Sequence, residues 1–149
     1  MLIPIAEALL VVLAFIAAVF AYMYLQGFLF AKMCKWNEIV ADFPLIESDN
    51  NSHKSYDRMT GDVNQIGMQR SFLIKIYSSG ISIRINSRFF GPIFVPWNKI
   101  QDVLVDTRGI VLVVEYKSQL RFCLPIDALN LIEELAPDLW RRKQIYKMF

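Results

Sequence analysis

The chain has 149 residues, a hydrophobic fraction of 55% and a formal net charge of +2. So small a charge argues against a dedicated nucleic-acid binder, because such a protein needs a dense basic face. The two cysteines, Cys34 and Cys123, belong to no CxxC motif and no Cys/His cluster. This pattern excludes a structural zinc site and fits a reducing compartment, and we expect no cofactor.

The hydrophobic residues are concentrated near the N-terminus. Residues 8–31 carry no charged side chain, and a helix of this length reaches about 36 Å, enough to cross a hydrocarbon core of about 30 Å. A cleaved signal peptide would need a basic start, whereas this chain opens MLIPIAE, with an acid and no base. We therefore predict a transmembrane anchor over residues 1–35 of a single-pass membrane protein, which leaves enough chain for one small domain.

The flanks of the span predict its orientation. Lys32 and Lys35 follow it, while Glu7 is the only charged side chain before it. Because positive residues favour the cytoplasmic side, the C-terminal domain is expected in the cytoplasm. Glu7 itself is expected either at the membrane interface or in contact with a partner helix.

Small residues recur along the span, several of them four positions apart. Such spacing lets two helices approach closely, but alanine is also an ordinary apolar filler, so both interpretations stay open. The small residues are Ala8, Ala14, Ala17, Ala18, Ala21, Gly27 and Ala31.

A short helix and a polar linker are predicted over residues 36–59. Trp36, Ile39 and Phe43 recur at helical spacing until Pro44 ends the pattern. Trp36 is placed either in the aromatic belt of the membrane interface or in the core of the domain.

Residues 47–56 are polar and lack periodicity, which predicts a loop. His53, the only histidine, lies there beside Ser52 and close to Asp57. A mobile loop does not hold the hydrogen-bond geometry that a catalytic triad needs, so His53 is interpreted as a solvated residue.

Residues 60–149 predict a β domain with a C-terminal helix and a basic tail. Apolar and polar residues alternate with period two, which is typical of strands with one buried face. After Pro125, residues 126–140 place apolar side chains at helical spacing, with Asp127 as a cap or dipole partner near the start. The predicted strands cover residues 71–78, 81–85, 100–106, 110–116 and 119–124, with a weaker strand around Val63, Gln65 and Met68.

This order of elements predicts an α+β protein. One N-terminal transmembrane helix is followed by a small antiparallel β split barrel with a C-terminal capping helix. The pleckstrin-homology (PH-like) or GRAM-like plan has this layout.

Three segments resemble those of uncharacterised bacterial single-pass membrane proteins with a cytoplasmic PH-like (GRAM-like) domain. They are Trp36 with the following NEIVADFP, the hairpin FLIKIYSSGISIRI, and the step FVPWNKI from Phe94 to Ile100. The resemblance implies a PH-like fold and a place in the bacterial inner membrane, and it implies no particular activity.

The most unusual segment is RFFGPIF, residues 88–94. If its rings are exposed, they form an apolar loop for the lipid interface or a partner groove; otherwise they are part of the barrel core. The residues of this candidate interaction loop are Arg88, Phe89, Phe90, Pro92 and Phe94.

The C-terminal nine residues carry four bases and no acid, and each base adds about 1 kcal/mol of attraction near an anionic leaflet. The alternative is a solvated helix end whose cations suit the helix dipole. The candidate lipid contacts are Arg141, Arg142, Lys143 and Lys147. Cys34, beside the membrane, is a candidate for palmitoylation.

The sequence contains no Gly-rich phosphate loop, no GxSxG and no HExxH. We therefore expect a non-enzymatic, membrane-anchored interaction module, such as an accessory subunit of a membrane protein complex. Its expected partners are the bilayer and either another membrane protein or a second copy, without nucleic acid. The alternative is a domain that senses anionic lipid at the membrane surface.

Overall fold

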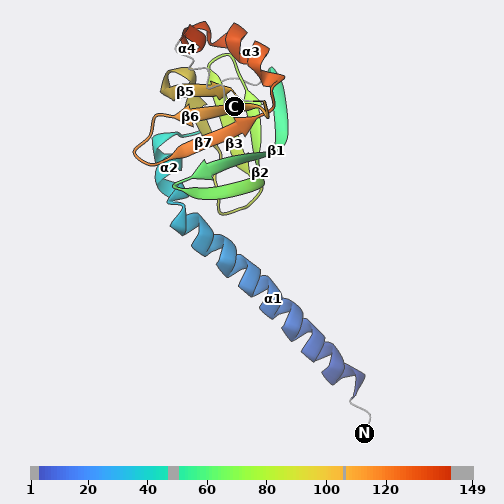
Figure 1. Ribbon diagram of the computed structural model, residues 1–149. Coiled ribbons are helices and arrows are strands. Elements are labelled where there is room, and N and C mark those ends of the chain that lie inside the picture. Colours follow the sequence, from blue (N-terminus) through green and yellow to red (C-terminus); the bar gives the residue numbers. More distant parts are fainter. Residues whose placement is uncertain (1–3, 47–50, 106, 142–149) are drawn as a thin grey trace.

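The computed structural model describes residues 4–46, 51–105 and 107–141. It opens with the long helix α1 (Ile5–Met33), which continues after the two residues Cys34 and Lys35 into the short helix α2 (Trp36–Asp42). Figure 1 shows α1 as a rod that leaves the lower end of a β domain. Lys35 takes the left-handed conformation, with φ of 52°, and this residue turns the chain from one helix into the next.

Helix α1 is long and apolar enough to cross a membrane. Its 29 residues reach about 43 Å at about 1.5 Å per residue. From its first residue to Gln26 every side chain is exposed, and so are large apolar ones such as Phe15, which is 70% exposed. A soluble helix would hide such side chains. The predicted apolar helix near the N-terminus is therefore confirmed by its length and composition.

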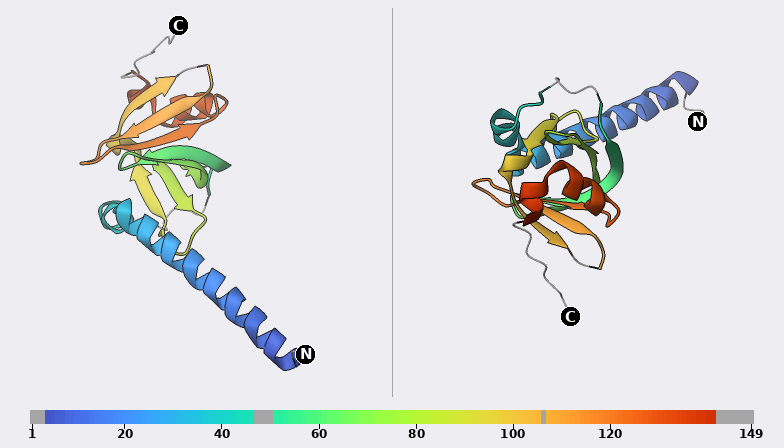
Figure 2. Two further views of the ribbon diagram at one scale, coloured as in Figure 1. Left: turned by 60° about the horizontal axis from the view of Figure 1, so that its bottom comes forward. Right: turned by 90° about the horizontal axis from the view of Figure 1, so that it is seen from above.

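The β domain is one seven-stranded antiparallel sheet with the strand order β4-β3-β2-β1-β7-β6-β5. Two meanders, β1 to β4 and β5 to β7, are joined where β1 pairs with β7, and the sheet curls into a half-barrel (Figure 2). The strands are β1 (Lys54–Val63), β2 (Ile66–Ile76), β3 (Gly80–Ile85), β4 (Ile93–Pro96), β5 (Ile100–Val105), β6 (Ile110–Val114) and β7 (Leu120–Leu124).

A 3-10 turn (Trp97–Lys99) links β4 to β5, and two helices, α3 (Ala128–Leu135) and α4 (Pro137–Arg141), follow the last strand. Both helices lie at the end of the domain opposite to α1 (Figures 1 and 2). The predicted fold class is confirmed in its architecture: an apolar helix, then a small antiparallel β half-barrel, then a C-terminal helix.

The core lies on the concave side of the sheet and is filled mainly by alternate residues of strands such as β2, β6 and β7, whereas β4 buries its first three residues in a row. Phe72 of β2 and Phe122 of β7 meet there edge to face, with ring centroids 5.2 Å apart. Ala128 and Ile132 of α3 are fully buried against the end of the sheet. No polar or charged residue is buried within the described part of the chain.

The first strand differs from the prediction. Residues 54–56, expected in a polar loop, begin β1. The register of β1 against β2 shifts twice between Tyr56 and Gly61, and Arg58 has φ of 56°. These irregularities remove the two-residue period on which strand prediction depends.

Two further differences concern turns and caps. Asn64 and Gln65, expected within a weak strand, form a two-residue hairpin turn with φ values of 51° and 69°. Asp127 makes no side-chain cap for α3; instead the Lys54 ammonium lies 2.6 Å from its carboxylate. Residues 47–50 of the predicted linker lie outside the described residues.

Candidate interaction site at the junction of α1 and the β domain

The segment between β3 and β4 does not project into solvent but contacts α1. Figure 2 (left) shows this loop lying beside the C-terminal half of the helix. The half-buried Phe89 ring meets the Tyr24 ring nearly edge-on, with centroids 4.6 Å apart and planes at 75°. Phe28, one helical turn further, lies 6.4 Å from the same ring. Such edge-to-face pairs add to the free energy of burying the rings.

Gly27 makes this contact sterically possible. It lies between Tyr24 and Phe28 on α1, and a β-carbon added there would stand 2.8 Å from two ring carbons of Phe89. That separation is well below van der Waals contact, so any larger residue has to displace the ring. The close packing of the Phe89 ring against the helix thus accounts for a glycine at position 27, without a second helix.

A second ring of the loop ties α1 to α2. Phe90 is buried between Phe30 of α1 and Trp36 of α2, with centroid separations of 6.1 Å and 5.6 Å. The Trp36 indole is fully buried, and its N–H donates a hydrogen bond of 2.7 Å to the carbonyl oxygen of Gly91. Trp36 therefore belongs to the core, and of its two predicted places the membrane interface is excluded.

The exit of α2 completes the junction by pairing with the edge strand β4. The Phe94 N–H donates a hydrogen bond of 3.1 Å to the Phe43 carbonyl, and Pro44 forms a β-bridge with Ile93. Because Phe94 is itself buried beside Tyr77, these contacts fix β4, α2 and the end of α1 to one another.

Of the five candidate loop residues, Arg88 alone is exposed. Its guanidinium carbon lies 5.9 Å from the centroid of the Tyr24 ring, at the outer limit of a cation–π contact. The rings of Phe89, Phe90 and Phe94 and the half-buried Pro92 follow the inward-packing alternative. The loop packs against α1 of the same chain, so its aromatic rings are not available to a separate partner.

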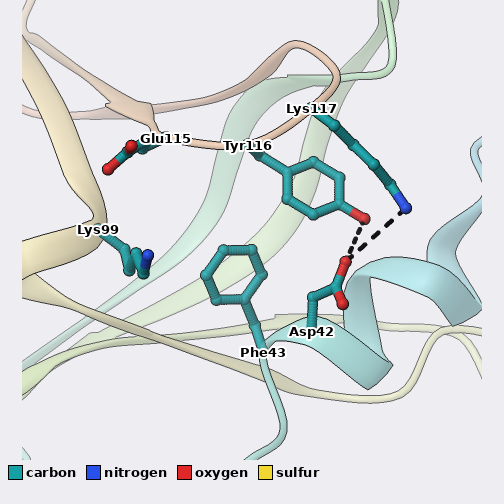
Figure 3. A pocket seen from close by; sticks show the side chains of 6 residues that line it. All are labelled: Asp42, Phe43, Lys99, Glu115, Tyr116 and Lys117. Carbon is teal, nitrogen blue, oxygen red and sulfur yellow. Dashed lines mark hydrogen bonds and ion pairs between the residues drawn. The ribbon is translucent and has the colours of Figure 1, made fainter.

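Another hollow, of about 520 Å³, opens where the end of α2 meets the turn between β6 and β7. In Figure 3 the Asp42 carboxylate faces both the Tyr116 hydroxyl and the Lys117 ammonium. The hydroxyl donates a hydrogen bond of 2.9 Å to Asp42, and the ammonium lies 3.0 Å from Glu38. Lys99 and Glu115 line the opposite side of the hollow.

Burial, with the hydrogen bond to Asp42 adding to it, raises the pKa of Tyr116. The hydrogen bond to Glu38 raises the pKa of Lys117. Both groups therefore keep their protons at neutral pH and stay bonded to α2. We interpret the hollow as the place where α2 is held against the β6–β7 turn, because Tyr116 and Lys117 bond to Asp42 and Glu38 of α2.

Cys34 is fully buried beneath the junction, and desolvation raises the pKa of its thiol. Acylation needs an accessible thiolate, so this position does not suit the palmitoylation that its sequence neighbourhood suggested. His53, on the surface, shares a hydrogen bond of 2.8 Å with Ser78 and forms no triad with Ser52 and Asp57.

The basic tail begins far from the junction. Arg141 ends α4, at the opposite end of the domain from α1 (Figure 1). Arg142, Lys143 and Lys147 lie outside the described residues. The small residues Ala8, Ala14, Ala17, Ala18 and Ala21 are exposed along α1, whereas Ala31 is buried against the domain.

No protein-family model matches the chain, and no curated protein does. Among solved structures, the chain is similar to a chain in the "Structure of the Spt16D Pob3N heterodimer", with a TM-score of 0.44 and 5% sequence identity. The match covers 64% of this chain and 55% of the other, so it spans little more than half of that chain's length. The function therefore has to be inferred from the chain's own residues.

Proposed function

We propose that this protein is a non-enzymatic, membrane-anchored interaction module that acts as an accessory subunit of a membrane protein complex. One observation carries the proposal: Phe89 and Phe90 fix the β domain directly to α1, with two residues between α1 and α2. A domain seated in this way presents a fixed surface beside the bilayer. Its partner is either another membrane protein or a second copy of this chain.

The surface of α1 supports a partner inside the membrane. Ala14, Ala18 and Ala21 lie exposed on one side of the helix, and the domain covers none of them. In lipid, small residues at this spacing allow a second helix to approach closely. The domain contacts begin only at Tyr24, so the whole preceding stretch is free for such a contact.

The arrangement of the ionisable groups among the described residues supports a non-enzymatic role. Within the described residues there is no group of three His, Cys, Asp or Glu side chains that could hold a metal ion. Burial is the first cause of the pKa shifts at Cys34 and Tyr116. Among the same described residues, the shifted pKa values of lysines and carboxylates belong to exposed ion pairs such as Lys54 and Asp127. Active sites place such groups in enclosed clefts instead.

We further propose that α1 spans the bacterial inner membrane with the β domain in the cytoplasm. Lys32 and Lys35 at the domain end of α1, against Glu7 at the other end, support this orientation. Alkaline phosphatase fused after residue 149 should be inactive, because that enzyme needs the periplasm to form its disulfides. An active fusion would reverse the orientation.

The test of the function is purification of the full chain in a mild detergent at native expression, after chemical crosslinking in cells. We expect a species heavier than the 17.3 kDa monomer. Changing Ala14, Ala18 and Ala21 together to leucine should weaken it if the helix face takes part. The matched control changes Val12 and Val19, on the other side of α1, to leucine. Recovery of a lone monomer would refute the proposal.

A further inference from the structure

Polar groups mark one level of α1. Gln26 is the only strongly polar side chain of the predicted span, and its amide nitrogen donates a hydrogen bond of 2.7 Å to the Tyr22 hydroxyl. Tyr24 lies between them and carries the Phe89 contact. Tyrosines concentrate where the hydrocarbon core meets the lipid headgroups. Tyr22 and Gln26 on one side of the helix and Tyr24 on the other thus form a polar band with the chemistry of a membrane interface.

The β domain has its own polar groups at the same level. Arg88 is exposed beside the Tyr24 ring, and a guanidinium inside the hydrocarbon core is costly. The backbone from Asn86 to Gly91 is neither helix nor strand, and lipid-exposed backbone of that kind does not occur in the hydrocarbon region. The hydrocarbon core therefore has to end before it reaches this loop.

The remaining part of α1 is long enough to cross the membrane. From Ile5 to Met23 there are 19 residues, or about 28 Å, against a hydrocarbon core of about 30 Å. Glu7 lies in the first turn of the helix, where its carboxylate reaches the headgroups of the other leaflet.

We infer that Ile5–Met23 crosses the hydrocarbon core and that the β3–β4 loop, with Arg88, lies in the phospholipid headgroup layer. This rests on the proposed membrane anchoring and adds to it a register and a lipid-facing surface. The predicted span, residues 8–31, would bring Arg88 into the hydrocarbon, so the span lies closer to the N-terminus by several residues. The domain sits directly on the bilayer surface.

Exposed apolar residues beyond Tyr24 allow the register to be tested. Leu29 is 46% exposed and is not covered by the domain. In a background with Cys34 and Cys123 changed to alanine, the full chain carrying Leu29→Cys, Phe15→Cys or Asn98→Cys is placed in phospholipid nanodiscs. A membrane-impermeant maleimide should label Leu29→Cys at least tenfold faster than Phe15→Cys, and Asn98→Cys fastest of all.

The outcomes separate the two ideas. Protection of Leu29→Cys to the level of Phe15→Cys would overturn the register while leaving the anchoring intact. Rapid labelling of Phe15→Cys would overturn the anchoring, and the register with it. Circular dichroism shows whether the cysteine-free background keeps its sheet, and if it does not, the buried Cys34 is retained and only the half-buried Cys123 is changed.

The position of the loop is measured separately. A fluorophore on Asn86→Cys should be quenched when the discs contain a lipid that carries chelated nickel on its headgroup. The same fluorophore on Asn98→Cys, near α4 at the far end of the domain, should be unaffected. Equal fluorescence of the two positions would place the loop away from the headgroups and overturn the inference.

Discussion

The two ends of the β domain are closed in different ways. At the end that meets α1, six aromatic rings from α1, α2 and the β3–β4 loop contact one another: Tyr24, Phe28, Phe30, Trp36, Phe89 and Phe90. At the end covered by α3, the buried side chains of the helix are aliphatic, Ala128 and Ile132. An exposed ion pair, between Lys54 and Asp127, joins β1 to the start of α3 at this end.

This contrast indicates that the two ends of the domain contribute differently to orientation and to stability. Aliphatic side chains stabilise a core mainly by removing apolar surface from water. Many combinations of similar total volume do this equally well. Aromatic pairs add a preferred geometry, so they fix the angle at which a separate helix sits. The end near α1 therefore sets orientation, whereas the end near α3 supplies stability. Single substitutions should separate these two properties.

Trp36→Ala is expected to have the largest effect because Trp36 contributes to both properties. The substitution empties a fully buried site and removes the hydrogen bond to Gly91. We expect a loss of about 3–5 kcal/mol in the free energy of unfolding, measured by guanidinium denaturation of the full chain in detergent. Trp36→Phe, which keeps a ring but not the donor, should lose less.

Ile132→Ala should weaken the opposite end without changing the junction. The side chain is fully buried under α3, and its truncation costs about 2–5 kcal/mol. In the folded protein, the rate of tryptic cleavage after Arg88 should stay as in the wild type. Faster cleavage under native conditions would show that the two ends are coupled and that the contrast is too simple.

Gly27→Leu should weaken the junction without changing the opposite end of the domain. The new side chain collides with the Phe89 ring, and overpacking of this kind costs about 1–3 kcal/mol. The cost falls on the contact between α1 and the loop, so cleavage after Arg88 should accelerate while the denaturation midpoint of the β domain changes little. Ala18→Leu, at an exposed position of the same helix, is the matched control and should alter neither quantity.

The Lys54–Asp127 pair should have the smallest effect, since both side chains are about half exposed. The pair lowers the pKa of Asp127 and raises that of Lys54. Its contribution is therefore present between their ordinary values of 3.8 and 10.5 and is lost as the pH moves below or above that window. Lys54→Met should leave the unfolding temperature at pH 7 nearly unchanged, and added salt should remove any difference.

Much of the β domain could be predicted from the sequence because its strands alternate regularly. β2 and β3 place Ile74, Ile76, Ile81 and Ile83 on one buried face, and that period is visible without tertiary information. β4 could not be recognised, because it begins inside the apolar RFFGPIF segment and its first three residues are all buried, which removes the alternation.

The junction could not be predicted, since it joins residues more than fifty positions apart. Tyr24 and Phe89 carry no local signal of their contact. The only hint was Gly27, which the sequence presented as one of several small residues for helix pairing. A small residue of α1 can make room for a second helix or for an aromatic ring of the domain. Which of the two it does depends on the face of α1 against which the domain packs, and the whole fold determines that face.

The two-residue link at Cys34–Lys35 has a consequence for how this protein meets other molecules. A flexible linker would let the domain sweep a volume that grows with linker length. Here there is no slack, because Lys35 is fixed in a left-handed conformation and the thiol of Cys34 is enclosed. With α1 in a bilayer, as proposed, the domain moves only as α1 moves, by rotating, tilting or diffusing sideways. It would then meet its partners within the plane of the membrane and at one fixed distance from it.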